Sequence, residues 1–166
     1  LIKAGLSKYN LGTIDPLRGL PAGRRILVPG QVADDASIRL GTSDVTTNAD
    51  LLRAARAANP AAVILYKPHP DVEKGLRNGA VPDAADYADA VLSGMDAITA
   101  IGLVDEVWTM TSTLGFEALL RGKRVTCLGT PFYAGWGLTD DRAMPIPRRA
   151  ASPDLTALVH AVLIDY

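Results

Sequence analysis

Three consecutive hydroxyl side chains, Thr111, Ser112 and Thr113, stand between a predicted strand and a predicted helix. The strand is expected over residues 105–110, and the helix should end at Gly122. The start of a helix leaves backbone N–H groups unpaired and carries the positive end of the helix dipole, and the hydroxyls add donors there. We therefore predict that this helix start binds an anion such as a phosphate.

Gly115 and Glu117 lie early in the same helix. If Thr113 is the N-cap, Glu117 lies four residues on, beyond the third position that a capping box uses. Its carboxylate is then available to accept paired hydrogen bonds from sugar hydroxyls. Gly115 would allow a ligand to approach the backbone closely. The alternative, in which the hydroxyls only cap a core helix and Glu117 is solvated, stays open.

Two more polar clusters follow predicted strands. Lys67 and His69 follow the apolar run at residues 61–66, and residues 31–37 follow the strand expected at residues 24–30. Because the carboxyl ends of parallel strands meet at one edge of a sheet, we expect all three clusters to lie in one cleft. His69 would then contact a phosphate or a leaving-group oxygen, with Lys67 as a supporting charge.

The cluster at residues 31–37 contains Gln31, Asp34 and Asp35. Gln31 and Asp35 are four residues apart, so they share a face if this loop is locally helical. Asp34 and Asp35 are both candidates for a catalytic carboxylate, and both are equally compatible with solvated loop residues. Adjacent side chains rarely face the same way, so we expect only one of them to matter.

Strands and helices alternate along the rest of the chain. Strands are expected at residues 24–30, 61–66, 88–92, 105–110 and 123–128, and helices at residues 48–58, 94–101, 113–122 and 154–165. This alternation predicts an α/β fold, a Rossmann-like parallel sheet with helices on both faces. Residues 1–23, rich in glycine and proline, are expected to be a linker segment before one domain at residues 24–166.

Residues 129–139 form a predicted loop that is rich in glycine and aromatic residues. We expect Phe132 and Trp136 to pack inward, because exposed aromatic rings at this density would form an apolar patch. An interface with another lobe of a larger protein is the alternative.

The composition argues against several functional classes. The 166 residues carry a net charge of −1 and no basic block, so there is no electrostatic basis for binding nucleic acid or a membrane surface. No apolar run approaches the ~20 residues that span a bilayer. The single cysteine, Cys127, excludes a disulfide scaffold and fits a reducing compartment. Neither an Asp-x-Asp pair nor a Walker loop nor a Gly-x-Gly-x-x-Gly fingerprint is present, so no metal, ATP or dinucleotide site is indicated.

Four motifs together resemble those of the KpsC-type capsule polysaccharide biosynthesis family, over most of residues 7–166. They are QVADDAS at residues 31–37, YKPHPDV at 66–72, TSTLGFEALLRG at 111–122 and PFYAGWGLT at 131–139. The four motifs in this order are specific, whereas an isolated His-Pro would be weak. The resemblance implies a two-lobed (GT-B) glycosyltransferase, a retaining β-Kdo transferase that transfers β-Kdo from CMP-β-Kdo to a lipid-linked Kdo acceptor.

The resemblance also implies roles for single residues. The family's Gln-x-x-x-Asp motif falls on Gln31 and Asp35, which makes these the catalytic candidates, with Asp35 as the nucleophile of a two-step, retaining transfer. Its His-Pro motif falls on His69 and Pro70, and its Ser/Thr pair on Thr111 and Ser112. The full set of nucleotide-binding candidates is His69, Lys67, Thr111, Ser112, Thr113 and Glu117, of which Glu117 would meet the ribose. No metal or other cofactor is expected.

A GT-B enzyme has two Rossmann-like lobes, and only 23 residues precede the first predicted strand. We therefore expect residues 24–166 to be the C-terminal, donor-binding lobe, inactive alone, with the acceptor lobe and its acid/base residue outside this sequence. The implied partners are the CMP-sugar donor, the lipid-linked Kdo acceptor and the capsule assembly machinery. The implied location is the cytoplasm, peripheral to the inner membrane.

Two alternatives stay open. One is another GT-B sugar-nucleotide enzyme, of the sialyltransferase or UDP-sugar 2-epimerase type. The other is a non-catalytic module for capsule export or protein interaction.

Overall fold

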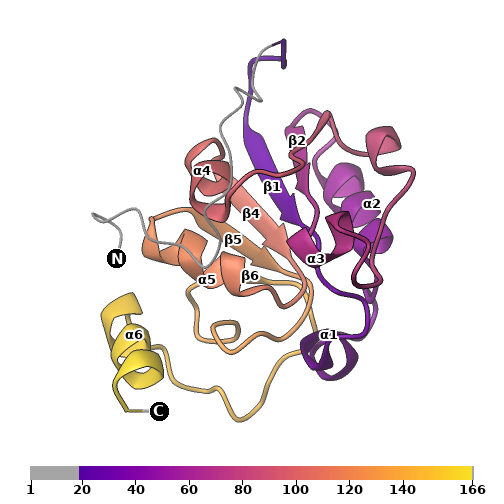
Figure 1. Cartoon of the computed structure of the whole chain (residues 1–166). Coiled ribbons are helices and arrows are strands. Elements are labelled where there is room, and N and C mark those ends of the chain that lie inside the picture. The colour runs from indigo at the N-terminus through magenta and orange to yellow at the C-terminus, as the bar shows by residue number, and fades with distance from the viewer. Residues whose placement is uncertain (1–18, 166) are drawn as a thin grey trace.

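The computed structural model describes residues 19–165 (Figure 1). Most of the linker predicted at residues 1–23 lies outside the described residues, and residues 19–24 belong to no helix or strand.

The described chain forms one six-stranded sheet in the order β3-β2-β1-β4-β5-β6. Every neighbouring pair of strands is parallel. This confirms the predicted Rossmann-like α/β fold. The strands are β1 (Arg25–Pro29), β2 (Val63–Lys67), β3 (Ala90–Val91), β4 (Glu106–Thr109), β5 (Arg124–Cys127) and β6 (Asp140–Asp141). The chain builds the sheet outward from β1 to β3 and then returns to β4 on the other side of β1, so a crevice is expected where β1 and β4 end.

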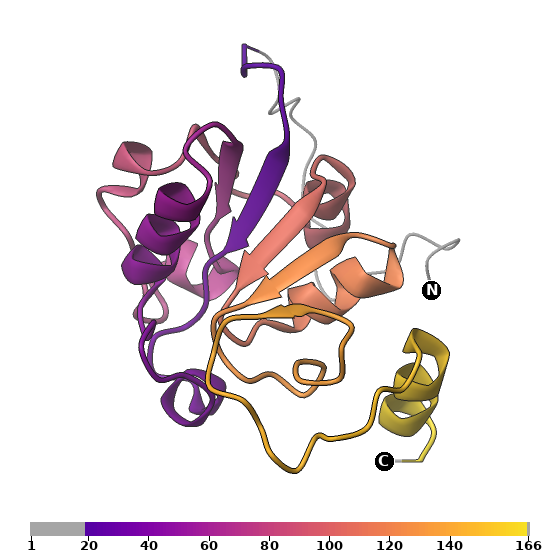
Figure 2. The ribbon, with the colours of Figure 1, turned by 180° about the vertical axis from the view of Figure 1, so that it is seen from behind.

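Helices cover both faces of the sheet, as Figures 1 and 2 show from opposite sides. They are α1 (Ala36–Gly41), α2 (Asn48–Ala58), α3 (Pro70–Glu73), the short 3-10 helix η1 (Ala84–Asp86), α4 (Ala97–Gly102), α5 (Thr113–Leu120) and α6 (Leu155–Leu163). One hydrophobic core joins the sheet to α4, α5 and α6, and a second joins the opposite face to α1 and α2.

The central strands have the composition that this position requires. All residues of β2 and β4 are buried, as are four of the five in β1, so none of these strands has the regular apolar–polar alternation of a half-exposed strand. Helix α2 packs the apolar face formed by Leu51, Leu52 and Ala55 on the sheet. Its N-terminus is capped by the Thr47 hydroxyl, which accepts a hydrogen bond of 3.1 Å from the Asp50 N–H.

Four elements were not predicted from the sequence: α1, α3, η1 and β6. Helix α1 has six residues, of which only Ile38 is buried, so it has no apolar periodicity to detect. Strand β6 consists of two exposed aspartates that pair with β5 at the edge of the sheet. The backbone conformations of α1 and β6 therefore depend on tertiary contacts rather than on a local sequence pattern. The strand expected at residues 88–92 is also shorter, with pairing only at Ala90–Val91.

Candidate functional site

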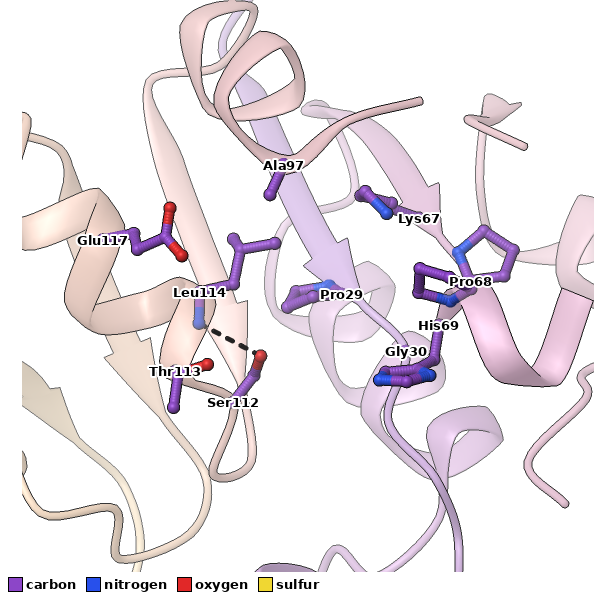
Figure 3. A pocket seen from close by; sticks show the side chains of 11 residues that line it. Pro29, Gly30, Lys67, Pro68, His69, Ala97, Ser112, Thr113, Leu114 and Glu117 are labelled. Atoms are coloured by element: carbon purple, nitrogen blue, oxygen red, sulfur yellow. Dashed lines mark hydrogen bonds between the residues drawn. The ribbon is translucent and has the colours of Figure 1, made fainter. Parts of the chain in front are cut away.

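A pocket opens at the carboxyl edge of the sheet, between the ends of β1 and β2 and the first turns of α5 (Figure 3). Its walls are Pro29, Gly30, Lys67, Pro68, His69, Pro70, Ala97, Ser112, Thr113, Leu114 and Glu117. Figure 3 shows Glu117 and the start of α5 on one side, Lys67 and His69 on the other, and Pro29 and Gly30 between them. The cavity volume is about 80 Å³. That is well below the roughly 300–1,000 Å³ of a pocket for a whole ligand, and suits one group of a ligand, such as a phosphate.

Lys67 is the last residue of β2 and is only 5% exposed. Burial lowers the pKa of its ammonium group, and Glu73 and Asp96 counteract part of that shift. The ammonium group of Lys67 forms no hydrogen bond or ion pair with any residue that the structure describes, although its backbone carbonyl accepts a hydrogen bond from the Gly30 N–H. A buried charge without a partner is unfavourable, so an anion in this pocket would stabilise Lys67 in its charged form.

Ser112, rather than Thr113, is the N-cap of α5. Its hydroxyl accepts a hydrogen bond of 3.2 Å from the Leu114 N–H, and its carbonyl accepts one of 2.5 Å from the Tyr133 hydroxyl. The expected N-cap was therefore one residue too late, because three consecutive hydroxyl residues are all acceptable caps. Thr113 is exposed and is the first helical residue, where the backbone N–H has no acceptor inside the helix.

Glu117 faces the pocket from the second turn of α5. Its Oε2 atom is buried and accepts no hydrogen bond from any residue that the structure describes, and it lies 3.8 Å from the nearest Arg121 nitrogen. Burial raises the pKa of Glu117, whereas Arg121 acts in the opposite direction. A carboxylate oxygen held in this way can accept hydrogen bonds from ligand hydroxyls.

His69 is the N-cap of α3, with Pro70 as the first helical residue. The Nδ1 atom accepts a hydrogen bond of 3.2 Å from the Asp71 N–H. In the neutral ring this interaction places the proton on Nε2, which makes Nε2 a donor.

Gln31 and Thr111 form a buried pair beside this pocket, and neither lines it. Gln31 Nε2 donates to the Thr111 hydroxyl at 2.9 Å, and Gln31 Oε1 accepts from the Thr111 N–H at 3.0 Å. The Gln31 backbone N–H and carbonyl both bond to the Asn48 side chain. The side chain of Gln31 thus connects the segment after β1 to the segment after β4. Because α1 begins only at Ala36, Gln31 and Asp35 do not share a helical face.

The two neighbouring aspartates have different environments. Asp34 forms an ion pair of 2.9 Å with Arg77, and this hydrogen bond holds the pKa of Asp34 below its ordinary value. Asp35 is exposed and caps α1, with Oδ1 accepting from the Ser37 N–H at 3.0 Å. Asp35 does not line the pocket that contains Lys67 and His69. It immediately precedes Ala36 and Ser37, which line a second pocket.

The structure therefore brings five of the eight predicted site residues together in one pocket: Lys67, His69, Ser112, Thr113 and Glu117. It places Gln31 and Thr111 next to them as a buried pair, and Asp35 at the start of α1. Sequence reasoning gave no role to Ala97, which reaches the pocket from the first turn of α4. No local signal pointed to it, because only the fold brings α4 to this edge.

The aromatic loop is organised around Tyr133 rather than around the two rings that we predicted. Tyr133 is fully buried, and Phe132 is 39% exposed and packs edge-on against Phe116. Trp136 is partly buried against the core, and its indole N–H donates to the Phe132 carbonyl at 2.8 Å. Trp136 thus packs inward as predicted, whereas Phe132 does so only in part, because its ring contacts Phe116 and Tyr133 but keeps an exposed side.

Gly115 allows close approach of a protein side chain, and not of a ligand as we expected. It is buried, and a Cβ atom there would lie 2.2 Å from the Tyr133 hydroxyl and 3.1 Å from Thr109. Gly115 therefore makes room for Tyr133 against α5, and not for a ligand.

Residues 6–166 match a sequence family described as "Capsule polysaccharide biosynthesis protein". The chain belongs to this family. Two curated relatives are also similar to it. The capsule polysaccharide modification protein LipA of Neisseria meningitidis serogroup B is 53% identical over 163 residues, and the match covers 97% of this chain and 23% of LipA. The lipopolysaccharide-processing protein LpsZ of Rhizobium meliloti is 48% identical over 166 residues, covering 98% of this chain and 38% of LpsZ.

Two solved structures are similar to the chain in sequence and in fold. The β-Kdo 2,7 transferase of Thermosulfurimonas dismutans KpsC is 42% identical with a TM-score of 0.77, and the match covers 88% of this chain and 47% of that one. The β-Kdo 2,4 transferase of the same KpsC is 32% identical with a TM-score of 0.82, covering 96% and 50%. The chain thus spans about half of each solved structure and less than half of each curated relative.

Over residues 19–165, no helix is both long and apolar enough to cross a membrane. Within the same part of the chain, no three His, Cys, Asp or Glu side chains are grouped so that they could hold a metal ion.

Proposed function

We propose that this chain is the donor-binding lobe of a retaining glycosyltransferase of capsule biosynthesis, and that its donor is CMP-β-Kdo. The observation that carries the proposal is the pocket where the buried, unpaired Lys67 and the start of α5 face each other. A donor with a single phosphate needs little countercharge, and this pocket offers one ammonium group and one helix N-terminus. The similarity to the two KpsC β-Kdo transferases supports the choice of donor.

The pocket residues would bind different parts of the nucleotide. The phosphate would accept hydrogen bonds from the Thr113 N–H and hydroxyl, from the Lys67 ammonium and from His69 Nε2. The Glu117 carboxylate, with its buried Oε2 unsatisfied by described residues, would accept hydrogen bonds from the ribose hydroxyls. The hydrogen bonds between Gln31 and Thr111 would fix the position of the segment before α5 relative to the end of β1.

Asp35 would be the nucleophile of a two-step transfer. In the first step its carboxylate attacks the anomeric carbon of the sugar, the bond from that carbon to the phosphate oxygen breaks, and CMP leaves. In the second step an acceptor hydroxyl attacks the same carbon, Asp35 leaves as the carboxylate, and the hydroxyl proton passes to a base of the other lobe. Two inversions give net retention.

The acceptor and the setting of the reaction belong to the same proposal. We place a lipid-linked Kdo acceptor on the other lobe of the full-length protein, and the reaction in the cytoplasm at the inner membrane. The free, buried Cys127 suits a reducing compartment.

Nucleotide selectivity tests the proposal. Calorimetric titration of the full-length protein with CMP, UMP, UDP and ADP should give the highest affinity for CMP. Preference for UDP would instead indicate an enzyme of the UDP-sugar epimerase type, and no nucleotide binding would indicate a non-catalytic module.

A further inference from the structure

A second pocket of about 490 Å³ shares Thr113 with the first. Its walls come from α1, from the start of α5, from the loop after β5 and from the segment at residues 146–149. This volume is within the range of roughly 300–1,000 Å³ that accommodates a whole small ligand. A ligand whose phosphate occupied the first pocket would therefore enter the second by passing Thr113.

The walls of the second pocket are tied to one another. The Gly41 carbonyl, at the end of α1, accepts hydrogen bonds from the Thr130 N–H at 2.7 Å and from its hydroxyl at 3.3 Å. Arg149 donates to the carbonyls of Pro131 and Ala134 at 2.5 and 2.6 Å. Four stretches of chain thus line one open pocket, and the guanidinium of Arg149 bonds to the loop that forms part of its wall.

The lining has the chemistry of a site for an acidic sugar. Ser37, Thr113 and Thr130 supply hydroxyls, and Leu40 and Phe132 supply an apolar surface. Sugars present both kinds of surface, hydroxyls at the ring edge and C–H groups on the ring faces. Of the described residues that line this pocket, none is acidic.

Arg148 is the charged group of this pocket that remains available. It is exposed, and it forms no ion pair or hydrogen bond with any residue that the structure describes. A guanidinium group binds a carboxylate through two parallel hydrogen bonds, a geometry that a neutral sugar hydroxyl does not reproduce.

We propose that the second pocket binds a carboxylate-bearing sugar, and that Arg148 recognises its carboxylate. The proposal rests on the proposed function, because the first pocket must hold the phosphate for the sugar to reach the second. The position of Asp35 agrees with it: Asp35 immediately precedes Ala36 and Ser37 of the pocket wall, so the proposed nucleophile stands beside the proposed sugar site. The carboxylate could come from the donor sugar or from the terminal sugar of the acceptor, and the experiment separates the two.

The test uses the full-length protein and its Arg148→Ala and Arg148→Lys variants. The KM values for CMP-β-Kdo and for a Kdo-terminated acceptor are measured, together with the calorimetric affinity for CMP. Arg148→Ala should raise one of the two KM values by about tenfold or more, the size expected for a hydrogen bond between charged groups. Arg148→Lys should restore part of the loss, because it keeps the charge without the paired geometry. Arg39→Ala is the matched control, since Arg39 is an exposed arginine of α1 that lines neither pocket.

Each outcome has one meaning. A higher KM for CMP-β-Kdo with unchanged CMP affinity assigns the pocket to the donor sugar, and a higher KM for the acceptor alone assigns it to the acceptor sugar. Unchanged KM values for both substrates, or a loss of CMP affinity equal to the rise in donor KM, would overturn the proposal while leaving the proposed function intact. A wild-type protein that bound no CMP would overturn the proposed function and this proposal with it.

Discussion

The neighbouring carboxylates of Asp34 and Asp35 have the same chemistry but different surroundings, and only one of them is the nucleophile in the proposed reaction. Asp34 forms an ion pair with Arg77, which stabilises its charged form. Asp35 caps α1 through Oδ1 and immediately precedes Ala36 and Ser37, two residues that line the second pocket. These environments make Asp35 the better candidate for a nucleophile.

In the full-length enzyme, Asp35→Asn should reduce transfer by at least about a thousandfold, because an amide does not attack the anomeric carbon. The affinity for CMP should stay close to that of the wild type, since Asp35 lies outside the first pocket. Radiolabelled sugar transfer and calorimetry measure the two quantities. Asp34→Asn is the matched control and should retain activity. Loss of activity only in Asp34→Asn would identify the other neighbour, and activity in both variants would exclude a covalent intermediate on either.

Lys67 is a residue at which the proposed binding role would conflict with stability. Burial lowers its pKa from the ordinary value of 10.5, so the charged form is less favourable in the folded protein than in the unfolded chain. Between the folded and unfolded pKa values the unfolded chain binds more protons. The free energy of unfolding therefore rises with pH between these two pKa values. Below the folded-state pKa, the full destabilisation from burying the charged Lys67 is present.

Lys67→Met should therefore stabilise the protein at neutral pH and weaken its binding of CMP. Removing the unpaired buried charge should raise the free energy of unfolding by at least ~1 kcal/mol, which corresponds to a rise of about 2–4 °C in the melting temperature. Thermal unfolding and calorimetry on the same preparations measure both effects. A variant with a lower melting temperature and normal CMP affinity would show that Lys67 stabilises the fold and does not bind CMP.

At the scale of elements, the position of α5 depends on its contact with the loop after β5. Gly115 lets Tyr133 approach the helix, and the Tyr133 hydroxyl then bonds to the carbonyl of Ser112, the N-cap residue. The end of α5 that we propose as the phosphate site is thus positioned by an aromatic residue that does not line the first pocket.

Gly115→Ala should destabilise the protein by ~1–3 kcal/mol, because the new methyl group would overlap the Tyr133 side chain in a packed core. Combining it with Tyr133→Phe should recover part of the loss, since the nearest clashing atom is the hydroxyl oxygen. Gly102→Ala is the matched control: Gly102 also lies in a helix, α4, and a Cβ there would meet no atom within 4 Å. Chemical denaturation gives the free energies of unfolding. Equal stability of the two alanine variants would contradict this role of Gly115.

At the scale of the whole molecule, the net charge of −1 provides no general attraction for a nucleotide. The proposed phosphate site therefore depends on local groups at one edge of the sheet: the Lys67 ammonium, the start of α5 and the His69 ring as a hydrogen-bond donor. The parallel topology makes this possible, because it gathers the carboxyl ends of β1, β2 and β4 at that edge.

We predict that CMP binding needs no divalent metal, since these local groups can balance a single phosphate. The affinity of the full-length protein for CMP should be the same in EDTA and in magnesium chloride. A strict requirement for magnesium would show that the phosphate is neutralised mainly by a metal, and would favour a different class of donor.

The sequence by itself determined the central strands, the helices α2 and α5, and the arrangement of polar clusters behind β1, β2 and β4. Buried strands and amphipathic helices are encoded in the spacing of near neighbours, so apolar runs and periodicity were enough to find them. The rule that ligands bind at the carboxyl edge of a parallel sheet then led from those strands to Lys67, His69 and Thr113.

Only the tertiary structure decided which of these polar residues face a cavity and which face each other. Gln31 and Thr111 are 80 residues apart, and their buried hydrogen bonds exist because β1 and β4 are adjacent in the sheet. Helix α1, the Tyr133 contact at Gly115 and the pocket beside Arg148 have the same origin. Each depends on segments that the strand order brings together, and contacts between distant segments leave no periodic pattern in either segment alone.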